Sequence, residues 1–159
     1  MGGTRVGAVI TWPDRIKGRA GEIRSQFTHV NDIAPTVLEA LGIEAPEVFN
    51  QVAQKPMDGR SFLDALQTGE APEHKTTQLF EVNGNRAIYH DGWMASAFHQ
   101  RLPWSVGVRG KASDMSEDTW ELYNLNDDFS QSTDLAGKEP AKLEELRGVF
   151  RARAQTLGI

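Results

Sequence analysis

Two turn signals in the middle of the chain constrain its fold more than any other feature. Asn83-Gly84 and Asp91-Gly92 are dipeptides that strongly favour tight β-hairpin turns, because both of their residues tolerate positive φ. The segments beside them, TTQLFEV, RAIYH and WMASAF, have the composition of strands. The sequence therefore predicts a three-stranded antiparallel meander, with DTWELYNL (118–125) as a fourth strand.

An amphipathic helix is predicted after the meander, in the segment PAKLEELRGVFRARAQTL. Pro140 suits the first helical position, where its missing N–H costs little. Leu143, Leu146, Phe150 and Leu157 share one face, with charged residues opposite. We expect this face to pack on the small sheet.

A second helix is predicted earlier in the chain, from HVNDIAPTVLEALG. Asn31 or Asp32 is expected to cap it, Pro35 falls in its first turn, and Gly42 ends it. Its apolar stripe comprises Ile33, Val37, Leu38 and Leu41. Residues 43–58 are expected to form an irregular connection, and SFLDAL (61–66) a short helix that Ser61 and Asp64 frame as a capping box.

The residues before these helices predict part of another sheet. Val6–Ile10 is a mostly apolar run that ends at Trp12-Pro13, and it suits a strand buried on both faces. Such a strand needs neighbours, and we expect none from the residues before it. The chain is therefore expected to be the tail of a larger protein, with residues 1–58 closing an α/β domain and residues 59–159 forming a second subdomain.

Composition excludes several classes of function. The formal net charge of −5 and the isoelectric point near 5.4 argue against nucleic acid as a partner, since that would favour a basic surface. No apolar stretch approaches the roughly 20 residues of a membrane span. The chain also lacks the pattern of a signal peptide, which leaves the compartment of the parent protein open. With no cysteine, disulfides, thiolate metal sites and cysteine nucleophiles are excluded within these residues.

Five pieces of the chain, taken together, resemble one family. GGTRV, WP, FTHVNDIAPTVLEALGI, KTTQLFEVNGNRAIYHDGWMA and DTWELYNLNDDFSQSTDLA resemble segments of the type I sulfatases, particularly the bacterial arylsulfatase group, in the same order. The resemblance implies a fold of the alkaline phosphatase and sulfatase type. A large α/β domain would precede an α+β subdomain, which has a small antiparallel sheet of about four strands and a C-terminal helix.

The resemblance also implies an activity, the hydrolysis of sulfate esters. The family uses a formylglycine made from the Cys or Ser of a C/S-x-P-S-R motif, a divalent cation that is usually calcium, and Lys and His residues around the sulfate. This sequence has no such motif, so we expect neither a catalytic residue nor a metal ligand in it. Calcium would be held by residues outside this chain in the intact family.

Two functions from different classes remain open. The chain is the C-terminal portion of an arylsulfatase-like sulfuric ester hydrolase, inactive alone and contributing scaffold and a substrate-access rim. Alternatively, it is a non-catalytic binding or oligomerisation module derived from a truncated sulfatase. Its expected partner is accordingly either the missing N-terminal sulfatase portion or a second copy that associates through residues 5–12.

The long segment after WMASAF holds the residues expected at the substrate rim. His99, Arg101 and Trp104 offer cations and an aromatic ring, which could meet an aryl sulfate by charge attraction and stacking. In related sulfatases, loops of the C-terminal subdomain reach toward the mouth of the active site. The alternative for all three residues is ordinary loop packing or exposure to solvent.

The other polar candidates are expected to be structural. Arg5 would anchor nearby carboxylates or carbonyls, Asp32 would serve the start of its helix, and Arg86 would form a local ion pair or support the first hairpin turn. Turn and helix-end positions account for most of the remaining residues, namely His29, His90, Glu81, Asn85, Asp127 and Asp128, and His74 is expected at the surface.

Overall fold

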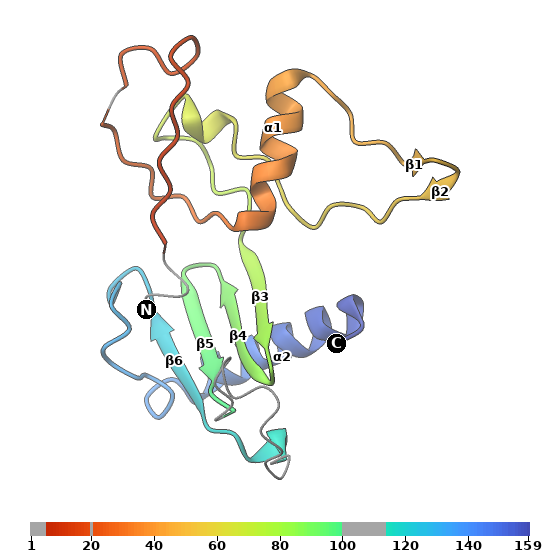
Figure 1. The fold of residues 1–159 in the computed structure, drawn as a ribbon. Coiled ribbons are helices and arrows are strands. Elements are labelled where there is room, and N and C mark those ends of the chain that lie inside the picture. Colours follow the sequence, from red (N-terminus) through yellow and green to blue (C-terminus); the bar gives the residue numbers. More distant parts are fainter. Residues whose placement is uncertain (1–5, 20, 100–113) are drawn as a thin grey trace. The chain divides into compact units, whose positions relative to one another are not determined.

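A computed structural model describes residues 6–19, 21–99 and 114–159, which fall into two compact units. The first unit spans Val6–Lys75 and the second contains Thr76–Ile159 (Figure 1). The segment after residue 58 bonds back to the first helix: Arg60 N–H donates to the Asp32 carboxylate, and Phe62 N–H to the Thr36 hydroxyl. The domain boundary expected after residue 58 stays a prediction.

The strand expected at the start of the first unit does not form, and this prediction was wrong. Residues 6–12 have no regular secondary structure. No described strand pairs with them, and the Val9 side chain is 95% exposed. An apolar run becomes a buried strand only where neighbouring strands satisfy its N–H and C=O groups. The composition of the run thus indicated a strand, but a pairing partner is missing among the described residues.

The first unit is built around a single α-helix. Its elements are η1 (Val30–Asp32), α1 (Ile33–Leu41), the strands β1 (Val48–Phe49) and β2 (Val52–Ala53), and η2 (Asp64–Leu66). Gly42 ends α1 in the left-handed conformation with φ 65°, as predicted. The helical segment begins differently from the prediction, because His29 caps it and Asp32 completes the capping box from the third position.

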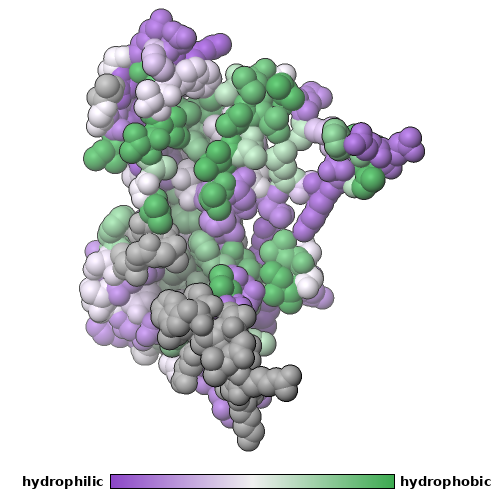
Figure 2. Space-filling view, in the orientation of Figure 1, coloured by the Kyte–Doolittle hydropathy of each residue, from purple (hydrophilic) through white to green (hydrophobic). Residues whose placement is uncertain are grey.

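Most of the expected apolar stripe of α1 faces outward. Ile33, Val37 and Leu41 are all at least half exposed, and Val30 continues the exposed row on η1. Figure 2 shows hydrophobic surface gathered over α1. By contrast, the buried hydrophobic residues among the described part of this unit are two alanines, Ala65 and Ala71.

Two details of the connection between α1 and the second unit differ from the sequence prediction. Within the irregular stretch, β1 and β2 form a small hairpin whose turn, Asn50-Gln51, has positive φ at both residues. The short helix is a 3₁₀ turn that starts at Asp64, later than expected. Ser61 accepts a hydrogen bond from Leu63 N–H instead of forming the predicted capping box.

The second unit contains the predicted four-stranded antiparallel sheet. Its strands are β3 (Thr77–Val82), β4 (Asn85–His90), β5 (Trp93–Ala97) and β6 (Trp120–Asn124), paired in the order β3-β4-β5-β6. Both predicted turns have positive φ at each central residue, so their twist matches that of the flanking strands. The expected sheet of about four strands is confirmed.

The helix α2 (Pro140–Leu157) covers one face of this sheet (Figure 1). Pro140 stands in its first turn, and Gly158 ends it in the left-handed conformation, as the sequence predicted. The apolar core consists of residues from the sheet and from the helix, namely Leu79, Ile88, Ala95, Leu122, Leu146, Phe150 and Ala154. The expected packing of α2 on the sheet is therefore confirmed.

Candidate functional site

One end of the sheet holds a cluster of three charged or titratable side chains: His99, Asp118 and Arg86. The Nδ1 atom of His99 lies 3.0 and 2.9 Å from the two carboxylate oxygens of Asp118. An Nη2 N–H of Arg86 donates to Oδ2 of the same carboxylate and to the Met115 carbonyl, the latter at 2.8 Å. The Asp118 side chain is nine-tenths buried, and one carboxylate thus serves both neighbours.

The strand ends bring these three residues together although they are far apart in the sequence. Arg86 lies near the start of β4 opposite Ala97 of β5, and Ala97 is in turn opposite Trp120 of β6. His99 follows β5, and Asp118 precedes β6. The two residues therefore meet where β5 ends and β6 begins.

The β3–β4 turn fixes the position of the histidine ring. The His99 N–H donates to the Asn85 side-chain oxygen at 2.9 Å. A Cβ on Gly84 would come within 2.6 Å of the ring's Cδ2, and the glycine has φ +89°. Glycine suits this turn position for two reasons. It adopts the positive φ without strain, and its lack of a side chain leaves room for the imidazole. His99 itself is 5% exposed, so it is a buried side chain and not an open loop residue.

An aromatic pair supports the arginine. The guanidinium carbon of Arg86 lies 5.5 Å from the centroid of the Trp120 ring, within the range of a cation–π contact. Trp120 in turn meets Phe150 of α2 edge-to-face at 5.5 Å. The cluster is thereby connected to the core of the second unit.

The first unit has a polar cluster of its own, around Asp32. This carboxylate is 1% exposed. It accepts hydrogen bonds from the backbone N–H groups of His29 and Arg60 at 2.7 and 2.8 Å, and it pairs with the Lys75 ammonium at 2.7 Å. Lys75 also donates to the Asn31 side-chain oxygen at 2.7 Å. Because these groups satisfy the buried carboxylate fully, the arrangement is structural.

The backbone at Gly59 packs directly against this cluster. A Cβ on Gly59 would lie 1.9 Å from the Asn31 carbonyl oxygen, which no side chain can occupy. Gly59 therefore allows the segment that carries Arg60 to reach Asp32. Neither Lys75 nor Gly59 was singled out from the sequence, since nothing in their local pattern indicates a partner more than 25 residues away.

The remaining histidines lie at surface or turn positions. His90 bonds the Thr77 hydroxyl at 2.8 Å across the β3–β4 pair. His74 is part-exposed and lies 2.6 Å from the Asp64 carboxylate. The hydrogen bond from His74 is the main reason that the pKa of Asp64 falls below its usual 3.8.

This lowered pKa gives a pH prediction. Because the folded state lowers the pKa of Asp64, its hydrogen bond with His74 stabilises the fold above pH 3.8, and that stabilisation is lost as the pH falls through the folded value. In a carboxyl-detected NMR titration, we expect Asp64 to titrate below 3.8 and to return toward that value in the His74→Ala variant. The His90→Ala variant is the control and should leave Asp64 unchanged. An Asp64 midpoint unaltered by loss of His74 would contradict the assignment.

The acidic pair Asp127-Asp128 supports turns and does not resemble a metal site. Asp128 accepts hydrogen bonds from Ser130 and from the backbone N–H groups of Ser132 and Thr133 at 2.7–2.9 Å. Asp127 accepts one from the Asn124 side chain at 2.6 Å. Within the described ranges, no group of three or more histidine or acidic side chains could hold a metal ion. These residues thus do not fit the calcium of the resembled family.

Three of the expected site residues lie outside the described ranges. Arg5, Arg101 and Trp104 fall in segments 1–5 and 100–113, so their roles stay predictions. Of the expected rim trio, His99 is the described member. Asp118 was missed by sequence reasoning, because an aspartate before a strand carries no local signal of a partner at position 99.

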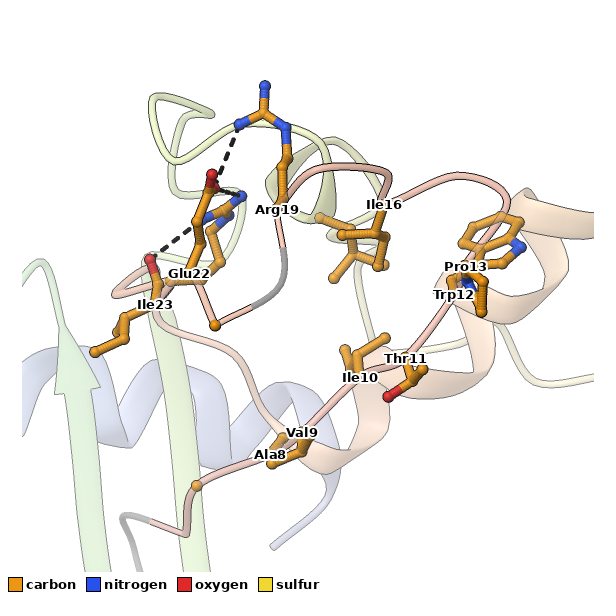
Figure 3. A pocket seen from close by; sticks show the side chains of 14 residues that line it. Ala8, Val9, Ile10, Thr11, Trp12, Pro13, Ile16, Arg19, Glu22 and Ile23 are labelled. Carbon is orange, nitrogen blue, oxygen red and sulfur yellow. Dashed lines mark hydrogen bonds and ion pairs between the residues drawn. The ribbon is translucent and has the colours of Figure 1, made fainter.

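A pocket of about 750 Å³ lies in the first unit (Figure 3). Its walls include apolar side chains of the expected strand and the following loop, among them Val9, Ile10, Trp12 and Ile16. Glu22 pairs with Arg19 and Arg24 on one side of it. The pocket thus adds solvent-exposed apolar surface to that of α1 in the same unit.

Comparison with known proteins shows a relation to the sulfatases. No family model matches the chain. An uncharacterized sulfatase of Schizosaccharomyces pombe is 30% identical over 148 residues, which make up 91% of this chain and 24% of the relative. The chain is related to the sulfatases. This sulfatase-related chain spans about a quarter of the length of the relatives that it matches.

Two solved structures share the fold of the sulfatase-related chain. BT4656, solved in complex with its substrate D-glucosamine-2-N,6-O-disulfate, matches 78% of this chain and 23% of its own, with a TM-score of 0.51 and 18% identity. A protein from the glycosaminoglycan metabolism of Bacteroides thetaiotaomicron matches 76% and 24%, with a TM-score of 0.51 and 19% identity. The α+β subdomain expected from the resemblance, with its small sheet and C-terminal helix, is thus confirmed.

Among the described residues, none of the helices has both the length and the apolar character needed to cross a bilayer.

Proposed function

We propose that this chain is the C-terminal portion of an arylsulfatase-like sulfuric ester hydrolase. It would supply the subdomain scaffold and part of the substrate rim, while the formylglycine nucleophile, the calcium ligands and the sulfate-binding residues would come from another part of the enzyme. The alternative is a non-catalytic module that associates with itself through the same surfaces. Both proposals accept the relation to the sulfatases and differ in what covers the first unit.

The outward-facing apolar surface of the first unit carries this proposal. Its described part buries two alanines, whereas large apolar side chains at Val9, Ile33, Val37 and Leu41 are exposed. A contiguous exposed apolar surface of this kind marks an interaction site. The stripe on α1 has the spacing of a helix that packs on a protein interior, so a further part of a sulfatase fold is the partner that fits it.

Co-expression tests the proposal directly. The partner would be a sulfatase polypeptide from the same genome that carries the C/S-x-P-S-R motif and lacks the part corresponding to this chain. We expect the two polypeptides to co-purify and to hydrolyse 4-nitrophenyl sulfate in the presence of calcium, and this chain alone to show no turnover. Robust hydrolysis by the isolated chain would contradict the proposal. A stable homo-oligomer that stays inactive with the partner polypeptide would favour the self-associating module.

Matched variants on α1 locate the interface. Val37→Glu places a charge in the middle of the exposed apolar stripe and should abolish co-purification, since burying an unpaired charge is costly. Glu39→Ala changes an exposed residue of the same helix outside that stripe and should leave assembly intact. Assembly unaffected by Val37→Glu would show that this stripe is not the contact.

His99 is the described residue proposed for the rim. In the assembled enzyme, we expect His99→Ala to lower kcat/KM by about tenfold, the effect of one lost hydrogen bond worth roughly 1.4 kcal/mol. His90→Ala removes a histidine from the opposite end of the same sheet and should leave kcat/KM unchanged. Equal values for the two variants would remove His99 from the rim and leave the scaffold role in place.

A further inference from the structure

The cluster at the end of the sheet contains a histidine–carboxylate pair whose geometry specifies where one proton lies. Both oxygens of Asp118 are within 3.0 Å of His99 Nδ1. An ionised carboxylate only accepts hydrogen bonds, so the nitrogen that faces it must carry hydrogen. The neutral imidazole then has its acceptor lone pair on Nε2. In orienting pairs of this kind, the carboxylate sets both the tautomer and the direction of the ring.

Arg86 gives the carboxylate a fixed orientation. Its guanidinium is charged at all relevant pH values, and it donates to Oδ2 of Asp118 and to the Met115 carbonyl. The Trp120 ring also lies against it, 5.5 Å from the guanidinium carbon. The guanidinium, itself fixed by the Met115 carbonyl and the Trp120 ring, thus holds Oδ2 of Asp118 in place and limits rotation of the carboxylate away from His99.

We propose that Asp118, held by Arg86, is the positioning residue of His99 and fixes it as the Nδ1–H tautomer. In the neutral ring, Nε2 is therefore a hydrogen-bond acceptor. This holds for any group that contacts it, whether from this chain or from a bound ester. The consequence for substrate selection rests on the proposed rim function of His99. The assignment of the tautomer stands on the contacts alone.

The amide variant Asp118→Asn should shift the tautomer toward the Nε2–H form. Because Arg86 donates to Oδ2, the amide oxygen will keep that place and the NH₂ group will take the place of Oδ1, 3.0 Å from His99 Nδ1. A protonated Nδ1 would then face a donor beside the oxygen that remains 2.9 Å away, so the Nε2–H form gains population. Asp118→Glu retains a carboxylate and should retain the Nδ1–H form. Asp114→Asn is the matched control, since Asp114 caps the neighbouring turn by accepting from Ser116 N–H and does not contact the ring.

Long-range ¹H–¹⁵N correlation spectra of the imidazole groups in the full chain measure this directly. We expect protonated Nδ1 on His99 in the wild type, in Asp118→Glu and in Asp114→Asn, and an increased share of the Nε2–H form in Asp118→Asn. A wild-type His99 in the Nε2–H form would overturn the proposal. So would an unchanged Nδ1–H form in folded Asp118→Asn. The wild-type spectrum tests the tautomer assignment even where that variant fails to fold.

Kinetics in the assembled enzyme separate this inference from the proposed function. If Asp118 acts through His99, Asp118→Asn should lower kcat/KM by no more than the tenfold of His99→Ala, and the double variant should be no worse than His99→Ala alone. Additive losses would overturn the positioning role. Should His99→Ala have no kinetic effect while the spectra show the expected tautomers, the rim function fails and the tautomer assignment stands.

Discussion

Replacing Asp32 with alanine should unfold the first unit. The Asp32 carboxylate accepts hydrogen bonds from two backbone N–H groups and pairs with the Lys75 ammonium, a residue that is 6% exposed. The substitution removes the carboxylate, and the buried ammonium loses this opposite charge. Breaking a buried pair by removing one partner typically costs about 3–5 kcal/mol. The described part of this unit buries no large apolar side chain. We therefore expect its apolar burial to stabilise it too little to offset such a loss.

Hydrogen exchange measured over α1 checks this prediction. A cost of about 3–5 kcal/mol corresponds to protection of the α1 amides falling by about a hundredfold or more. Asp14→Ala is the matched control, an exposed aspartate in the same unit, where the free energy of unfolding should change by less than about 0.5 kcal/mol. Equal protection in both variants would show that the Asp32 cluster does not hold the unit together.

The second unit could be predicted from the sequence because its signals are local. Asn83-Gly84 and Asp91-Gly92 specify two turns without reference to the rest of the chain, and Pro140 and Gly158 mark the ends of α2. Once two hairpins and an amphipathic helix are given, the order of the strands follows from their short connections. Packing of the helix on the sheet then follows from its apolar face.

The expected strand at Val6–Ile10 failed for the opposite reason. Whether an apolar run becomes a strand depends on partners, and its own composition cannot supply them. The same dependence explains α1, whose stripe indicated a buried face although that face is exposed among the described residues. For such elements, the sequence predicted where apolar surface lies but not what covers it.

The polar clusters were only partly predictable. Asp32 was expected to serve its helix, yet its contact with Lys75 spans most of the first unit and has no local signature. Likewise, His99 stood out as a histidine at a strand end, but its partner Asp118 follows a segment of weak pattern. Both pairs form through tertiary packing, which brings together residues that no motif connects.

Replacing Leu146 with alanine should destabilise the second unit strongly. Leu146 is fully buried at 0% exposure, on the face of α2 that packs on the sheet. Truncating a buried leucine costs about 2–5 kcal/mol, since apolar contacts are lost and the cavity closes only in part. Alanine favours helices at least as well as leucine, so the loss will come from packing and not from the helix itself.

Urea unfolding of the full chain, followed by the fluorescence of the sheet tryptophans, measures the effect. Glu145→Ala changes the neighbouring exposed residue of the same helix and removes an ion pair with Lys142; its cost should stay within about 0.5 kcal/mol. Because Trp120 contacts both Phe150 and Arg86, loosening of α2 should also reach the His99 cluster. We therefore expect Leu146→Ala to broaden the His99 imidazole signals well below the unfolding transition, and unaltered signals there would mean that the cluster is held by the sheet alone.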